Sequence, residues 1–103
     1  MDEALKLART AVEKFPKVPN VLDTIGWIYY KKGVYGSAVD FLKESIEGSP
    51  DSAAHHYHLG MSYFGLGDRQ KASASLNRAI KLNPAFSGVD EARNTLAKLE
   101  SPK

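Results

Sequence analysis

The chain has 103 residues, of which 43% are hydrophobic and 25% charged, and its formal net charge at pH 7 is +2. This composition is that of one globular domain and argues against a disordered chain. Basic residues alternate with acidic ones, so we expect no nucleic-acid binding. The apolar runs are far shorter than the roughly 20 residues of a transmembrane helix, so we expect no membrane insertion. The absence of cysteine excludes disulfides and thiol chemistry.

Helical periodicity begins at the N-terminus. Residues 1–16 predict an amphipathic helix ending at Pro16, with an apolar face made of Ala4, Leu7, Ala8, Ala11, Val12 and Phe15. Pro19 is typical of a first helical position, and the second helix should run to about Lys32 before Gly33 ends it. A third helix is expected over about 35–48, burying Ala38, Phe41, Leu42, Ser45 and Ile46.

The second half of the chain has the same order of signals. A fourth helix is expected at about 52–66, capped by Asp51 or Ser52, and a fifth at about 69–82, capped by Asp68. The last helix, 87–100, combines a narrow apolar stripe with a polar outer face. Such a helix is typical of the terminal cap of a solenoid.

The halves are related by an internal repeat. Ile25-Gly26-x-x-Tyr29 aligns with Leu59-Gly60-x-x-Tyr63 at an offset of 34 residues. The same offset links further pairs: Gly33 with Gly67, Ala38 with Ala72, Leu42 with Leu76, Pro50 with Pro84, and Pro16 with Pro50. On these residues the chain resembles the tetratricopeptide repeat (TPR) family, whose unit is a helical hairpin of this length. The run from Asp23 to Gly33 also resembles the closing repeats of long bacterial members of that family.

The resemblance implies an all-α, right-handed superhelix of about six helices in one domain. Residues 1–16 would be the second helix of a truncated repeat, 19–52 and 53–86 two full repeats, and 87–100 the capping helix. The apolar face of residues 1–16 should then be partly uncovered. Either the chain is a fragment of a longer repeat protein, or this face docks a partner or a second copy.

Two mid-helix glycines and three histidines need separate explanations. Gly26 and Gly60 should let the partner helix approach closely, opposite Ala38 and Ala72. His55 and His58 are three residues apart and could share a metal, but no acidic residue at helical spacing completes a set, so we expect no metal, cofactor or catalytic centre. We expect His55 to be solvated, His56 packed inward at the position equivalent to Leu22, and His58 to lie beside a groove, where it could make a pH-sensitive contact.

In proteins that this chain resembles, the first helix of each repeat lines a concave surface that binds an extended peptide or a partner's helix. Carried over by position, the predicted groove consists of Asn20, Asp23, Thr24, Trp27, Tyr30, Tyr57, His58, Met61 and Phe64, with Glu91 and Thr95 at its edge. One branch of the family holds the C-terminal carboxylate of chaperones with Lys and Asn. Here those positions hold Asp23, Trp27, Tyr57 and Met61, so we expect a partner with apolar anchors instead.

An alternative interpretation places Trp27 on Met61 and Tyr30 on Phe64 as a core between the repeats. The functional hypothesis is a scaffold or adaptor that binds a protein or peptide, without catalytic activity. The alternative is a structural segment of a longer solenoid, or self-association through the N-terminal helix.

Overall fold

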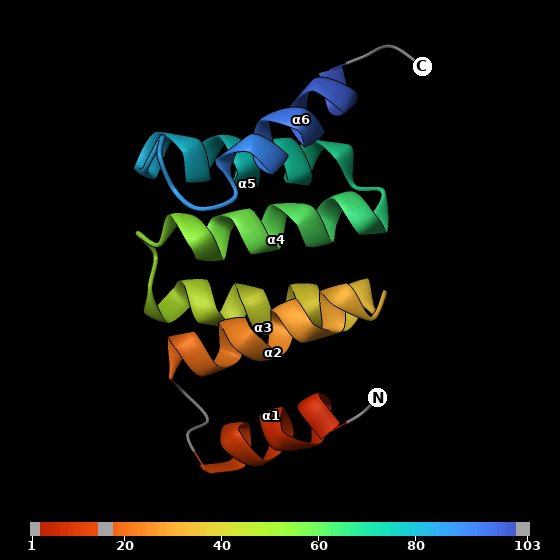
Figure 1. Cartoon of the computed structure of the whole chain (residues 1–103), viewed down its shortest axis with the longest axis vertical. Helices are drawn as coiled ribbons and strands as arrows, with labels where there is room; N and C mark the ends of the chain where they lie inside the picture. The colour runs from red at the N-terminus through yellow and green to blue at the C-terminus, as the bar shows by residue number, and fades with distance from the viewer. Residues whose placement is uncertain (1–2, 15–17, 101–103) are drawn as a thin grey trace.

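Two helical hairpins stacked on each other form the middle of the molecule (Figure 1). The computed structural model describes residues 3–14 and 18–100, whose regular structure is entirely helical. The elements in chain order are α1 (Glu3–Lys14), α2 (Pro19–Lys31), α3 (Tyr35–Gly48), α4 (Ala53–Leu66), α5 (Arg69–Leu82) and α6 (Val89–Glu100). Helices α2 and α3 form the first hairpin and α4 and α5 the second, with α1 and α6 at the two ends. No helix in the described residues is long and apolar enough to cross a membrane.

Local sequence signals set most helix ends, as expected. Pro19 occupies the start of α2, and Gly33 ends that hairpin turn with a φ of 80°. The Ser52 hydroxyl caps α4 by accepting a hydrogen bond from the His55 backbone N–H at 3.3 Å. The Asp68 carboxylate caps α5 in the same way from Lys71, at 3.1 Å. Phe15 and Pro16, and the side chains of Ala4, Ala8 and Val12, lie outside what the structure describes.

The capping helix begins two residues later than the sequence pattern indicates. Gly88 has a φ of 105°, which is incompatible with a right-handed helix, so α6 starts at Val89. Gly88 also packs closely on Tyr57, because a Cβ at this glycine would lie 2.9 Å from a carbon of the tyrosine ring. At its other end, the Arg69 guanidinium donates to the Leu99 carbonyl oxygen at 2.6 Å. These contacts fix both ends of α6 to the second hairpin.

Each hairpin has a glycine at its seam. A Cβ at Gly26 would lie 2.6 Å from Cγ of Leu42, and one at Gly60 would lie 2.7 Å from Cγ of Leu76. The close approach predicted for both glycines is confirmed. The side chain that fills the space is a leucine, one turn after the alanine named from the sequence. At Gly26 the partner helix also brings the Ala38 carbonyl oxygen to 3.2 Å.

Two hydrophobic clusters meet on α4. The α4–α6 cluster is made of Ala53, Tyr57, Met61, Leu76, Ala79, Phe86, Ala92 and Leu96. The α3–α4 cluster is made of Ala38, Val39, Leu42, Leu59, Tyr63 and Ala72. Helix α4 therefore buries side chains toward both hairpins, and Figure 1 shows it between α3 on one side and α5 on the other.

Candidate partner-binding surface

Three rings stack across the boundary between the hairpins, and we call them the aromatic ladder: Tyr30, Trp27 and His58. Trp27 and Tyr30 lie three residues apart on α2, which places their rings on one helix face, 4.4 Å apart and almost parallel at 5°. The His58 ring of α4 lies 4.0 Å from Trp27. All three side chains are half-buried. The ladder therefore joins α2 to α4 and still presents part of its rings to solvent.

A carboxylate holds the α4 end of the ladder. Nδ1 of His58 lies 2.9 and 3.0 Å from the two carboxylate oxygens of Asp23, so the ring donates its Nδ1 proton to this acid. Asp23 is only 9% exposed. The bond spans the two hairpins and sets the orientation of the imidazole that stacks on Trp27. The sequence placed both residues in the predicted groove but gave no sign that they are bonded.

The predicted groove residues separate into three groups. Asp23, Trp27, Tyr30, Tyr57 and His58 come together, with the Tyr57 ring 5.7 Å from Trp27. Met61 and Phe64 pack into the two hydrophobic clusters. Asn20 and Thr24 are exposed and line an apolar hollow of about 240 Å³ with Ala11, Val21 and Ile25, between α1 and α2.

The second hairpin's part of the predicted surface is more buried than the first's. Met61 is 4% exposed and Tyr57 is 9% exposed. The segment around α6 encloses both, because the Thr95 hydroxyl lies 3.5 Å from the Met61 sulfur and the Phe86 ring lies 5.3 Å from Tyr57. Thr95, expected at the groove edge, is itself buried. Met61 and the body of Tyr57 therefore contribute to the core that supports the ladder.

Burial raises the pKa of two tyrosines at the ladder: Tyr30, which is part of it, and Tyr57, whose ring lies next to Trp27. Burial raises the pKa of Tyr30, and the nearby Tyr35 and Glu91 raise it further. Burial also raises the pKa of Tyr57, with Glu91 again adding to the effect. Both hydroxyls therefore stay protonated at neutral pH and can donate or accept a hydrogen bond. Glu91, which the sequence placed at the groove edge, is exposed on α6.

The expectation that His55 is solvated is wrong. His55 is 4% exposed, with Nε2 3.9 Å from a carboxylate oxygen of Asp23 and Nδ1 without a hydrogen-bond partner among the described residues. The equivalent position on α2, Val21, is half-buried, whereas His55 lies on a helix that contacts α2, α3, α5 and α6. His56, expected inside, is half-buried and its Nε2 lies 2.8 Å from the Pro50 carbonyl oxygen. No group of three potential metal-ligating side chains occurs in the described residues.

The burial of His55 predicts an acid-sensitive fold. Desolvation lowers its pKa below the ordinary 6.5, while Asp23 partly opposes this effect. The folded state therefore prefers neutral His55, so its contribution to stability is complete above about pH 6.5 and decreases as the pH falls through that value toward the lower pKa of the folded state. Urea unfolding at about pH 7.5 and pH 5.5 should show a smaller pH-dependent loss in His55→Gln than in the wild type. His56→Gln is the control and should lose as much stability as the wild type. Equal losses of unfolding free energy between the two pH values in all three proteins would contradict the prediction.

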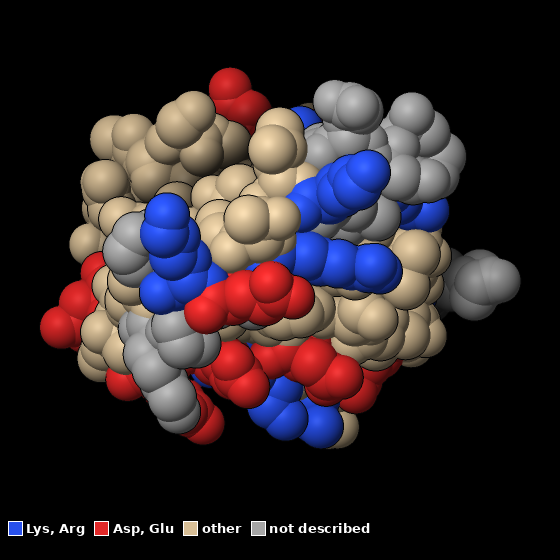
Figure 2. All heavy atoms as spheres, turned by 90° about the horizontal axis from the view of Figure 1, so that it is seen from below, with Lys and Arg blue, Asp and Glu red and all other residues tan. Residues whose placement is uncertain are grey.

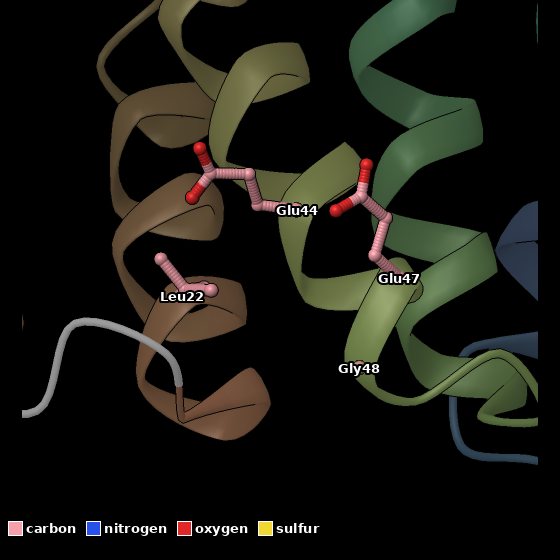
Figure 3. Close-up of a pocket in the computed structure, with 4 residues that line it drawn as sticks. All are labelled: Leu22, Glu44, Glu47 and Gly48. Carbon is pink, nitrogen blue, oxygen red and sulfur yellow. The ribbon is translucent and has the colours of Figure 1, made fainter.

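A larger hollow lies elsewhere, between α2 and α3. It measures about 390 Å³ and is lined by Leu22, Glu44, Glu47 and Gly48 (Figure 3). Figure 3 shows both carboxylates projecting from α3, with Leu22 on the neighbouring helix. Both glutamates are exposed. None of the residues that line this acidic hollow belongs to the aromatic ladder.

Charged side chains of both signs lie on the face seen from the α1 end of the molecule. In Figure 2, which views the stack from that end, lysine and arginine side chains lie beside aspartate and glutamate side chains among uncharged atoms. This arrangement agrees with the mixed charge pattern of the sequence.

Comparison with known proteins agrees with the helical-hairpin fold. Residues 56–86 match the family model described as tetratricopeptide repeat. The second TPR domain of the human RPAP3 protein, solved in complex with the HSP70 peptide SGPTIEEVD, superposes with a TM-score of 0.85 at 15% identity, covering 98% of this chain and 82% of that one. The first TPR domain of human RPAP3 gives 0.79 at 16% identity, covering 96% and 81%. No curated protein matches this chain by sequence.

The chain therefore has the fold of a TPR domain, all-α with six helices in its described part, and its residues 56–86 also match the repeat by sequence.

Proposed function

We propose that this chain is a protein–protein interaction module, a scaffold or adaptor that binds a peptide or partner helix on the aromatic ladder. One observation carries the proposal: Trp27, Tyr30 and His58 form a stack that joins the two hairpins, and all three residues are only half-buried. Large, rigid and partly exposed Trp and Tyr side chains are the typical hot spots of protein interfaces. TPR domains form a family of non-catalytic binding modules, which supports a binding role.

The fold comparison also supports a peptide partner. A domain of the same fold, the second TPR domain of RPAP3, is solved with a bound HSP70 peptide. In this chain the groove positions hold Asp23, Trp27, Tyr57 and Met61, so we propose a partner with apolar anchors in place of an acidic C-terminal tail. The resemblance to the closing repeats of long bacterial TPR proteins remains a prediction.

Peptide selection followed by titration tests this function. A random-peptide display library would be selected on the immobilised domain, and the enriched peptides titrated while following fluorescence of Trp27, the single tryptophan of the chain. We expect apolar side chains at helical spacing in those peptides. Tyr30→Ala should weaken binding about 30-fold or more, the scale of a hot-spot residue. Trp27→Ala should weaken binding to a similar extent, and its affinity would be measured by calorimetry because the variant has no tryptophan to follow.

A matched aromatic control is available on the other side of α2. Tyr29 and Phe41 form a second stacked pair, with ring centroids 5.6 Å apart and both side chains half-buried. Phe41→Ala should leave peptide affinity unchanged, while circular dichroism confirms that all variants are folded. Equal loss of binding in Phe41→Ala and Tyr30→Ala, or full affinity in Tyr30→Ala, would argue against the ladder as the binding surface.

Self-association is a second candidate function, favoured by exposed apolar surface near the N-terminus. Leu7 is 70% exposed on α1, and the apolar hollow lined by Ala11, Val21 and Ile25 lies between α1 and α2. Light scattering across a concentration series distinguishes the two functions. Self-association predicts a rising mean mass that Leu7→Glu abolishes, whereas the interaction-module proposal predicts a constant mass.

A further inference from the structure

One ring nitrogen of His58 has no hydrogen-bond partner in the part of the chain that the structure describes. Nδ1 of this ring lies 2.9 and 3.0 Å from the two carboxylate oxygens of Asp23, whereas no bond joins Nε2 to a described residue. Among the described side chains, the nitrogen that is both enclosed and unpartnered is Nδ1 of His55. Nε2 of His58 is therefore open to solvent, and the side chain as a whole is 17% exposed.

The bond to Asp23 determines what this open nitrogen can do. A carboxylate only accepts hydrogen bonds, so Nδ1 of His58 carries a proton, and the other nitrogen of a neutral imidazole is then an acceptor. The same ring lies 4.0 Å from the Trp27 ring, with an angle of 27° between the two planes. The aromatic ladder therefore combines a surface of stacked rings with one open hydrogen-bond acceptor.

We propose that the partner's anchor is a tryptophan, whose indole packs on the aromatic ladder and donates its N–H to Nε2 of His58. This inference rests on the proposed function and names the side chain that the ladder recognises. The indole N–H donates and cannot accept, which matches a nitrogen that only accepts, and its rings suit an aromatic surface. A cationic donor is disfavoured, because the Lys31 ammonium lies 5.8 Å from the centre of the Trp27 ring.

Two synthetic peptides test the hydrogen bond. Both would be helical, about 14 residues long, with leucine at positions i and i+7 and an aromatic anchor at i+4. The anchor is tryptophan in one peptide and naphthylalanine, which keeps the fused rings but lacks the N–H, in the other. Calorimetry at about pH 8, where imidazole side chains are ordinarily neutral, measures both affinities. We expect the tryptophan peptide to bind about five-fold more tightly, the scale of one hydrogen bond between neutral groups.

Variants of His58 locate the effect. His58→Phe keeps a ring beside Trp27 and removes the acceptor, so it should abolish the preference for the tryptophan peptide. It also leaves the buried Asp23 carboxylate without its partner, which costs stability. The double variant Asp23→Leu/His58→Phe replaces both partners by apolar side chains and should lack the preference too. His56→Phe is the matched control, because His56 is also half-buried on α4 but bonds to Pro50 outside the ladder, and it should keep the preference.

The tautomer of His58 can be measured without any peptide. Nitrogen NMR spectra of the isotope-labelled protein at the same pH should show the His58 ring protonated at Nδ1. Adding the tryptophan peptide should shift the Nε2 resonance more than adding the naphthylalanine peptide does. A ring protonated at Nε2 would overturn the inference, because that nitrogen would then donate and could not accept from an indole.

The outcomes separate this inference from the function on which it rests. Equal affinity for the two peptides, lost for both in Tyr30→Ala, would overturn the hydrogen bond to His58 and leave the interaction module standing. A preference that both His58 variants retain would overturn the assignment to this nitrogen. If neither peptide binds while peptides enriched by library selection do, the inference fails and the interaction module stands. If the library yields no binder either, both fail.

Discussion

Replacing Tyr57 by alanine should lower the free energy of unfolding by about 3–5 kcal/mol, the range of buried aromatic truncations. Tyr57 is 9% exposed, and its ring packs against Phe86 and Trp27. It also fills the space over Gly88, where even a Cβ would lie within 2.9 Å of the ring. The truncation therefore opens a cavity where α4 meets the turn into α6. Chemical denaturation monitored by circular dichroism measures the loss.

Two further variants test whether the stability lost in Tyr57→Ala comes from the buried ring. Tyr57→Phe keeps the ring and removes the hydroxyl, so it should retain most of the stability. Trp27→Ala should cost less than Tyr57→Ala, because Trp27 is half-buried and part of its surface already lies in solvent. A larger loss in Trp27→Ala than in Tyr57→Ala would place Trp27 in the core between the repeats and would weaken its assignment to a binding surface.

Gly26→Leu should destabilise the protein by about 1–3 kcal/mol, because it overpacks the seam of the first hairpin. The Cγ of Leu42 would lie 2.6 Å from the first added carbon, and the Ala38 carbonyl oxygen 3.2 Å from it. The leucine could change rotamer, but the carbonyl belongs to the backbone of α3. The two helices would therefore have to separate. Thermal unfolding measures the effect.

A second glycine provides the control for this substitution. Gly36 lies in the first turn of α3 and is exposed. Apart from its chain neighbours and the backbone of its own helix, nothing in the described residues lies within 4 Å of an added Cβ. Gly36→Leu should leave the stability unchanged or raise it slightly, because it removes backbone freedom from the unfolded chain. Similar melting temperatures for Gly26→Leu and wild type would contradict the close helix approach.

Most of the fold could be predicted from the sequence because its signals are local. Proline, glycine and capping side chains define the helix ends, and the 34-residue repeat pairs Gly26 with Gly60. The burial of a side chain also depends on which helices lie next to its own, and the repeat predicted this burial wrongly. His55 corresponds to Val21, yet His55 is buried and Val21 half-buried, because the two helices that carry them have different neighbours.

The candidate site was less predictable for the same reason. Helical spacing predicted that Trp27 and Tyr30 share a face, and the structure stacks them. The bond between Asp23 and His58 joins residues 35 apart in sequence, and no pattern within one repeat specifies it. Met61 is buried partly against Thr95 of α6, a helix that departs from the repeat, so the repeat pattern did not predict this burial.

Because both hydrophobic clusters include residues of α4, neither hairpin can open without exposing part of that helix. Repeat arrays often lose their units one at a time from an end, since each unit contacts only its neighbours. Because α4 of the second hairpin also packs against α3 of the first, the described helices offer no interior boundary at which such stepwise fraying can stop. Its melting is therefore expected to be cooperative, with the two stacked hairpins of the middle behaving thermodynamically as one unit.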